Sequence, residues 1–344
     1  MTNFISRPLK TFLKASLLLQ LGLFTACNNG EKKEQMAENH GSTLTADKNN
    51  ADLTLPDGFG AKKVADDIGA ARHLVVNSEG DIIVKLADVK NDHGIVVLKD
   101  TNGDAKVDSI SGFGNYGGTG IAMKNGYLYA SSNSAVYRYK LDAQELPTNT
   151  DNPDTLISGL IDRRQHNSKS ITFDDNGNIY VNIGAYSNSC QKQDRTPGSP
   201  GIRPCPILDS AGGIWQFKAN KLNQTYGDGI RYATGLRNVV GLDWNQQANK
   251  LFVMMHGRDQ LHSLFPDLYT EEESAVLPAE CMYALEKGDD AGWPYIYYDQ
   301  QQNKKILAPE YGGNGKKEGA PDAVDPVVAF PGHLAPDGLL FYTG

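Results

Sequence analysis

The chain has 344 residues and a formal charge of −8, from 33 basic and 41 acidic side chains with the histidines counted as neutral. An acidic chain without a block of Lys and Arg is a poor nucleic-acid binder, because phosphate neutralisation supplies most of that affinity, and nothing in it resembles a basic membrane-surface helix. Hydrophobic residues make up 40% of the chain, which argues against disorder for most of it. The 36 glycines and many tyrosines favour short strands joined by tight turns and therefore an all-β fold.

The N-terminus has the features of a targeting segment. Arg7, Lys10 and Lys14 precede an apolar run over residues 15–26, which is shorter than the ~20 residues that a membrane span needs. Cys27 follows, and Phe-Thr-Ala-Cys at 24–27 resembles a bacterial lipobox. We predict a lipoprotein signal peptide over 1–26 and a flexible tether with lipidated Cys27 over 27–50, against the alternative of an ordinary secretory signal followed by a chance cysteine.

This prediction sets the compartment and the charge of the mature chain. Removing residues 1–26 leaves 30 basic and 41 acidic side chains, a net charge of −11. We expect an exported bacterial lipoprotein in the periplasm or on the cell surface, attached to the membrane only through the lipid on Cys27.

Four segments between residues 74 and 253 share one pattern, in which an apolar triplet, a polar turn and a second apolar run follow one another. Composition and turn chemistry predict a β-hairpin for each. The hairpins are residues 74–76 and 82–84 around Gly80, 121–123 and 127–129 around Gly126, 171–173 and 179–181 around Gly177, and 242–244 and 251–253 around Asn249.

Further strands are predicted after each hairpin. Third strands are expected at 95–98, 136–139, 214–217 and 282–285, and fourth strands at stretches such as 156–160 and 232–236. Four strands recurring at this length predict a β-propeller over residues 51–344, with about four full blades and part of a fifth. A β-sandwich is the second-ranked alternative.

An acidic stretch follows the third strand of the first unit. Asp100, Asn102, Asp104 and Asp108 place oxygen-bearing side chains at alternating positions, as in a calcium-binding loop. The stretch lacks the Gly and Glu of a complete EF-hand loop, and the alternative is a solvated hairpin turn.

In a propeller, the connections that lead into each innermost strand emerge at one mouth of the central channel, together with the connections between second and third strands. The polar residues expected at this mouth are Arg72 and His73, residues 117–119, residues 165–167, Arg237 and Asn238, and His333. The long insertions 185–208 and 256–280 are expected to wall it. The sequence therefore predicts a functional site at this mouth.

The cysteines other than Cys27 are interpreted from the exported location. Cys190 and Cys205 lie in one Gly/Pro-rich segment, and we predict that they form a disulfide, against the alternatives of two free thiols or part of a metal site. Cys281 is expected to be a buried apolar residue.

His166 is the candidate general base of the mouth, because imidazole is the usual proton acceptor near neutral pH. Arg237 is a candidate for stabilising an anion or holding a carboxylate-bearing cofactor. The chain has no nucleophile elbow, no His-Glu-x-x-His motif and no dinucleotide-binding fingerprint. A base with a cationic clamp and no nucleophile suits proton abstraction with hydride transfer to a bound cofactor.

Short motifs in a fixed order extend this interpretation. They are Leu-Pro-Asp-Gly-Phe at 55–59, Ala-Arg-His at 71–73, Gly-Leu-Arg-Asn at 235–238, Gly-Arg-Asp at 257–259, Gly-Trp-Pro-Tyr at 292–295 and Phe-Tyr-Thr-Gly at 341–344. As an ordered set over residues 53–344, they resemble the glucose/sorbosone dehydrogenases, which are quinoproteins on a six-bladed propeller that use pyrroloquinoline quinone (PQQ) and Ca²⁺.

The resemblance implies roles for residues of the mouth. His166 matches the base that takes the alcohol proton, and Arg237 and Asn238 match the segment that contacts the quinone. Gly257 and Arg258 match the loop whose backbone carbonyls bind the site calcium, which an oxygen-only set of ligands suits.

Gln165, Arg72 and His256 are further candidates for contact with the quinone. Two positions depart from the family. Relatives that act on glucose carry Asp where this chain has Gln165, and residues 116–119 lack a Gln that those relatives use on the quinone.

The resemblance makes a quinoprotein sugar or aldose dehydrogenase the leading expectation, with a sugar or polyol as substrate and a cytochrome or a quinone as electron acceptor. One alternative is a calcium-dependent hydrolase of the lactonase kind, which would need an Asp/Glu/Asn cage that we do not locate in the sequence. The other is a non-catalytic surface lipoprotein that binds glycans.

The last predicted element is the beginning of a fifth unit, with a turn at 335–338 and a strand at 339–342. Residues 52–65 are expected to supply the strand that completes the last blade. Because a single strand would leave Phe341 and Tyr342 on a bare edge, we expect the sequence to be a C-terminally incomplete propeller.

Overall fold

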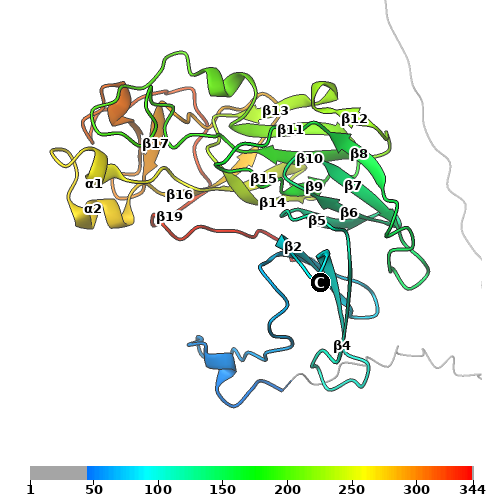
Figure 1. Ribbon diagram of the computed structural model, residues 1–344. Helices are drawn as coiled ribbons and strands as arrows, with labels where there is room; N and C mark the ends of the chain where they lie inside the picture. The colour runs from blue at the N-terminus through cyan, green and yellow to red at the C-terminus, as the bar shows by residue number, and fades with distance from the viewer. Residues whose placement is uncertain (1–44, 343–344) are drawn as a thin grey trace, which may run out of the picture. The chain divides into compact units, whose positions relative to one another are not determined.

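The computed structural model describes residues 45–342 of the chain. The predicted signal peptide, Cys27 and most of the predicted tether lie outside these residues. The described part is nearly all β and confirms the predicted propeller arrangement, with four antiparallel sheets that follow one another along the chain (Figure 1).

Each of the four sheets contains one predicted unit. The first is β1 (Ala71–Val76), β2 (Ile82–Lys90), β3 (His93–Lys99) and β4 (Ser109–Phe113); the second is β5 (Ile121–Lys124), β6 (Tyr127–Ser131), β7 (Val136–Lys140) and β8 (Asp154–Ser158); the third is β9 (Ile171–Phe173), β10 (Asn178–Ile183), β11 (Gly213–Lys218) and β13 (Ile230–Thr234); and the fourth is β14 (Val239–Asn245), β15 (Lys250–Met255), β16 (Glu280–Leu285) and β19 (Val328–Phe330). The short β12 (Gln224–Thr225) pairs in parallel with β8, so it joins the second sheet although it follows the third strand of the third.

The first hairpin of every sheet turns where the sequence predicted it. Gly80, Gly126, Gly177 and Asn249 all have a positive φ. Glycine adopts this conformation without a Cβ clash, and Asn tolerates it better than most residues. Three of the four turns thus account for part of the chain's high glycine content.

Aromatic side chains pack neighbouring sheets against one another. Phe113 of β4 meets Tyr139 of β7 with ring centroids 5.0 Å apart. The rings of Tyr129 and Phe173 are 4.6 Å apart, and Tyr180 stacks on Trp244 at 5.2 Å. Such pairs add to the hydrophobic burial that holds the sheets together.

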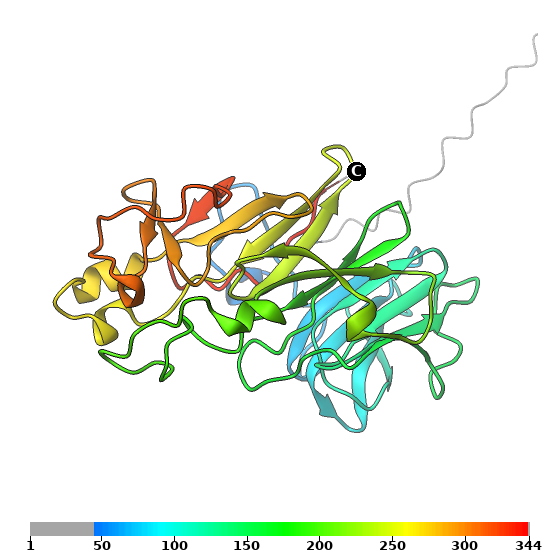
Figure 2. The same cartoon turned by 90° about the horizontal axis from the view of Figure 1, so that it is seen from above.

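The second long insertion is structured, and a third insertion was not predicted. Residues 256–280 contain α1 (Leu261–Leu264) and α2 (Glu271–Val276), and β17 (Ile296–Asp299) pairs with β18 (Lys304–Leu307) between β16 and β19. Tyr297 and Ile306 of this hairpin share a buried cluster with Leu261, Tyr269 and Leu277. Figure 2 shows the helices in yellow beside the orange hairpin.

Short 3₁₀ helices are η1 (Asn50–Asp52), η2 (Pro206–Asp209), η3 (Tyr226–Asp228) and η4 (Pro309–Tyr311).

Two predicted strands are absent from the described residues. The segment 52–65 forms no strand; its Lys62 Nζ donates to the carbonyl of Asp104, and its Val64 carbonyl accepts from Val107 N–H at 2.8 Å, in the β3–β4 connection. The segment 339–342 is also not a strand, although Phe341 N–H donates to Asp243 of β14 at 2.9 Å. Both segments make isolated contacts in place of a continuous ladder, so these two predictions were wrong.

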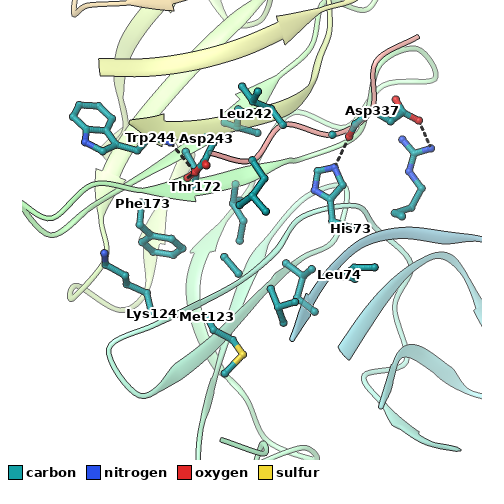
Figure 3. A pocket seen from close by; sticks show the side chains of 18 of the residues that line it. His73, Leu74, Met123, Lys124, Thr172, Phe173, Leu242, Asp243, Trp244 and Asp337 are labelled. Carbon is teal, nitrogen blue, oxygen red and sulfur yellow. Dashed lines mark hydrogen bonds and ion pairs between the residues drawn. The ribbon is translucent and has the colours of Figure 1, made fainter. Parts of the chain in front are cut away.

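The innermost strands β1, β5, β9 and β14 line a cavity of about 840 Å³ together with residues 337–340. Figure 3 shows Leu74, Met123, Phe173 and Leu242 around it, with His73 and Asp337 at one end. The wall is mostly apolar. The innermost strands that line this channel hold the mouth residues in place, but the channel itself has few groups that could take part in catalysis. Within residues 45–342, no helix has the length and apolar character to cross a membrane.

Candidate active site

His166 lies in the connection that enters β9, with φ of +52°, a conformation that few non-glycine residues adopt. Its Nδ1 is hydrogen-bonded to the carbonyl oxygen of Ala185. Because a carbonyl only accepts, Nδ1 carries the proton and Nε2 keeps its lone pair. Burial and the nearby Arg237 guanidinium lower the pKa of His166 to about 4. At neutral pH the side chain is therefore an uncharged imidazole whose Nε2 lone pair can accept a hydrogen bond or a proton.

The backbone around His166 leaves no room for a side chain at position 184. A Cβ on Gly184 would meet the His166 carbonyl oxygen at 2.5 Å and the His166 Cβ at 2.7 Å. The next residue, Ala185, donates its N–H to the Arg237 carbonyl at 2.8 Å. The two residues that follow β10 thus connect the imidazole to the Arg237 segment.

Arg237 and Asn238 are both buried and contain polar atoms without a partner among the described residues. Arg237 Nη2 donates to Asp259 Oδ2 at 2.8 Å, while Arg237 Nε has no partner. Asn238 Nδ2 lies 3.4 Å from His256 Nδ1, while Asn238 Oδ1 has no partner. Buried polar atoms without a partner are costly and rare, so this donor and acceptor fit a polar ligand.

Asp259 connects two guanidinium groups. Its Oδ2 accepts from Arg237 at 2.8 Å and from Arg195 at 2.9 Å. Burial acts to raise the pKa of Asp259, but Arg237 and Arg195 outweigh it and hold the pKa below its ordinary value. The aspartate is ionised at neutral pH, and burial lowers the pKa of Arg237 only to about 10, so the guanidinium stays charged.

The first long insertion, residues 185–208, brings Arg195 to this group. The predicted cysteine pair links two points of the same insertion. Cys190 and Cys205 form a disulfide with an S–S distance of 2.02 Å. Gln165, a predicted quinone contact, donates its Nε2 to Asp194 of the insertion at 2.7 Å. Cys281 is a free, buried thiol, and burial raises its pKa to about 12.

Arg72, His73 and Asp337 form a second group at the mouth. Arg72 Nη1 lies 3.3 Å from Asp337 Oδ2, and His73 Nε2 lies 2.8 Å from the Asp337 carbonyl (Figure 3). The predicted quinone contact Arg72 is thus paired with Asp337, and its contact with the quinone stays a prediction. His256 lies between the groups, with Nε2 3.2 Å from the Pro336 carbonyl and 3.4 Å from Asp337 Oδ1.

The other predicted mouth positions have structural contacts. Thr119 donates to Ser168 Oγ at 3.1 Å, and Gly117 and Gly118 lie where a Cβ would meet backbone oxygens at 2.1 Å and 2.0 Å. His333 is bonded through Nε2 to the Ser274 carbonyl at 2.9 Å.

Gly257 and Arg258, the predicted backbone ligands of calcium, lie at the start of the second insertion. Gly257 N–H donates to Glu280 at 2.9 Å, and buried Arg258 is paired with Glu310 at 2.6 Å. These contacts hold the loop, while calcium binding by its carbonyls stays a prediction. In the described part of the chain, no group of three or more His, Cys, Asp or Glu side chains is arranged to hold a metal ion.

The acidic stretch forms the β3–β4 connection, and its carboxylates accept hydrogen bonds from their own loop. Asp100 accepts from Gly103 N–H at 2.7 Å, and Asp108 accepts from Asn102 Nδ2 at 2.9 Å. Asp104 accepts from Lys106 N–H at 2.8 Å. The structure thus favours the hairpin turn over the calcium loop predicted from Asp100, Asn102, Asp104 and Asp108.

Sequence reasoning did not single out Asp259, Asp194, Arg195 or Asn188. Asn188 Oδ1 accepts from Asp259 N–H at 2.9 Å, and its Nδ2 donates to the Asp259 carbonyl at 3.1 Å. The two insertions come together through this pair. The Gly-Arg-Asp motif at 257–259 could have pointed to Asp259, and the predicted convergence of the two insertions at one mouth could have pointed to the others.

The chain was compared with known proteins. The family model described as TrAA12-like matches residues 53–344. An uncharacterized protein of Borreliella burgdorferi is 28% identical over 112 residues, which cover 33% of this chain and only about a quarter of that protein's length, 25%.

Two solved structures share the fold. A carbohydrate-active enzyme of family AA12 from Trichoderma reesei has a TM-score of 0.63 and 17% identity, covering 80% of this chain and 71% of that one. The holo PQQ domain of a pyranose dehydrogenase from Coprinopsis cinerea has a TM-score of 0.61 and 19% identity, covering 82% and 70% of the two chains.

Proposed function

We propose a function for this chain, which belongs to the TrAA12-like family. Its resemblance to the quinoprotein sugar dehydrogenases led us to expect such a family. We infer that it is a PQQ-dependent oxidoreductase that oxidises a sugar at a CH–OH group. The observation that carries the proposal is the group at the mouth, where a neutral His166 with a lone pair on Nε2 lies beside the unpartnered Arg237 Nε and Asn238 Oδ1.

His166 acts as the general base. Its Nε2 accepts the proton of the substrate hydroxyl, while the Ala185 carbonyl holds the ring through Nδ1–H and stabilises the imidazolium that forms. The positive φ at His166 and the absence of a side chain at Gly184 fix where the ring lies. A base held in one orientation needs no rearrangement when the substrate arrives.

Arg237 and Asn238 would hold the quinone. Arg237 offers Nε–H as a charge-assisted donor to a carboxylate or carbonyl oxygen, and Asn238 Oδ1 accepts a hydrogen bond. When bound, PQQ supplies the acceptor for the hydride that leaves the substrate carbon. Calcium enters the proposal through the resemblance alone, with the backbone carbonyls of Gly257 and Arg258 as its ligands.

Reconstitution tests the proposed function. The purified chain is incubated with PQQ and Ca²⁺, passed over a gel-filtration column, and mixed with a redox dye and a panel of neutral pyranoses and aldoses. We expect quinone absorbance to stay with the protein and at least one sugar to reduce the dye. No retained quinone together with no dye reduction would contradict the proposal.

We also propose that the chain is an exported lipoprotein and that its electrons pass to a cytochrome or quinone of the same compartment. This proposal rests on the basic residues, the apolar run and Cys27 of the N-terminus. Mass spectrometry of the N-terminal peptide from membranes should find diacylglycerol on Cys27. A Cys27→Ala variant that remains as membrane-bound as the wild type would contradict this anchoring.

A further inference from the structure

Asp259 is the residue through which the two insertions reach the buried Arg237. Its carboxylate Oδ2 lies 2.8 Å from Arg237 Nη2 and 2.9 Å from Arg195 Nη2. The Arg237 side chain is 4% exposed and that of Asp259 is 38% exposed, so one partner is inside the protein and the other borders solvent.

The backbone of Asp259 is held by several side-chain contacts. Asn188 bonds both its N–H and its carbonyl, at 2.9 Å and 3.1 Å. Arg258 Nε and Nη2 donate to the same carbonyl at 3.2 Å, and Arg258 is itself paired with buried Glu310. Asn188 is fixed in turn, because its carbonyl accepts from Trp293 Nε1 at 3.0 Å. Because its backbone is held in place, Asp259 can present its carboxylate in a defined position and so orient Arg237.

The contact with Asp259 decides how Arg237 is presented. It engages one terminal nitrogen of the guanidinium, while Nε stays without a partner. Because the guanidinium is planar, fixing Nη2 restricts the direction in which Nε–H points. We propose that Asp259 is a positioning residue that holds Arg237 so that its Nε–H faces the quinone, an inference that rests on the proposed function.

A positioning role for Asp259 and a purely electrostatic role predict changes of opposite sign in the quinone Kd when the negative charge is removed. The quinone carries carboxylates, so removing the negative charge of Asp259 should strengthen its binding if Asp259 were only a nearby opposing charge. Positioning predicts weaker binding, because Arg237 loses the partner that orients it. The two accounts are therefore distinguished by the direction of the change in quinone Kd.

The test is an equilibrium titration of the full chain with PQQ, followed by quinone absorbance or protein fluorescence. Asp259→Asn should raise the quinone Kd by about tenfold or more. The matched control is Asp267→Asn, which alters an exposed carboxylate in the same insertion and should leave the Kd unchanged. An unchanged or lower Kd in the Asp259→Asn variant, with quinone binding intact in the wild type, would overturn the inference and leave the proposed function standing.

A double-mutant cycle shows whether Asp259 acts through Arg237. In an Arg237→Met background, Asp259→Asn should change the Kd by less than about twofold, and fully additive effects would overturn the inference. If Asp259→Asn fails to fold, Asp259→Glu keeps the charge and moves the carboxylate; it should also weaken binding, and a wild-type Kd would overturn the inference. Failure of the wild type to bind PQQ would instead remove the proposed function, and the inference with it.

Discussion

Two groups at the mouth contain the same three residue types and differ in how deeply their arginines are buried and paired. One is His166, Arg237 and Asp259, and the other is Arg72, His73 and Asp337. In the second group, His73 is bonded to a backbone carbonyl and the Arg72 and Asp337 side chains are 27% and 50% exposed. In the first, Arg237 is buried and retains an unpartnered Nε.

The comparison shows that residue type and position at a mouth are not sufficient to identify a site. Burial makes an unpartnered polar atom costly, and the fold keeps that cost only where other contacts fix the group. Arg237 is fixed by Asp259, and Asn238 by its approach to His256. The second group lines one end of the cavity, and its arginine is more exposed and paired with Asp337, so we expect it to contribute less to quinone binding.

The largest expected effect separates the two histidines. His166→Ala removes the proposed base and should lower kcat at least about 10³-fold while PQQ still binds. His73→Ala, the matched change in the other group, should lower kcat by no more than about threefold. Steady-state dye reduction with quinone titration measures both, and comparable losses in the two variants would mean that the groups are not distinct.

A smaller effect is expected from a methyl group beside His166. Gly184→Ala places a Cβ 2.5 Å from the His166 carbonyl oxygen, so the imidazole must move, and kcat should fall about 10–100-fold. Gly177→Ala is the control, because a Cβ there meets nothing within 4 Å. The control residue has a positive φ, so it should lower only the thermal stability. A Gly184→Ala enzyme with normal kcat would place the reacting base elsewhere.

The smallest expected effect is a shift on the pH axis. Burial and Arg237 lower the pKa of His166 to about 4 from its ordinary 6.5. The imidazole is neutral above this pKa and protonated below it, so a signal from His166 should titrate near pH 4 and not near 6.5. NMR of the His166 ring, identified with His166→Ala, measures the midpoint. A midpoint near 6.5 would show that the ring is solvated and not held beside Arg237.

The regular part of the fold could be predicted because its signals are local. The hairpins around Gly80, Gly126 and Gly177 combine apolar triplets with a turn residue a few positions away. By contrast, β19 pairs Val328 with Met282, and β12 pairs Gln224 with Ile157, across long stretches of chain. Short strands with distant partners carry too little pattern to be recognised.

The residues of the candidate site likewise include some that local sequence signals predict and some that they do not. His166 and Arg237 could be named because they lie at predictable entries to inner strands and match family motifs. Arg195 and Asp259 reach them from insertions whose paths depend on contacts such as Asn188 with Asp259. Arg72 was predicted from its position at the mouth and the Ala-Arg-His motif, but its pairing with Asp337, a distant residue in the sequence, could not be predicted.

In the proposed function, the His166 group and not the Arg72 group binds the quinone. Equilibrium titration with PQQ of the wild type, Arg237→Lys and Arg72→Lys tests it most directly. Lysine keeps the charge but lacks the planar donor set, so Arg237→Lys should raise the Kd about 10–100-fold, whereas Arg72→Lys should stay within about twofold of the wild type. A loss of binding in Arg72→Lys with none in Arg237→Lys would show that the quinone binds at the Arg72 group instead.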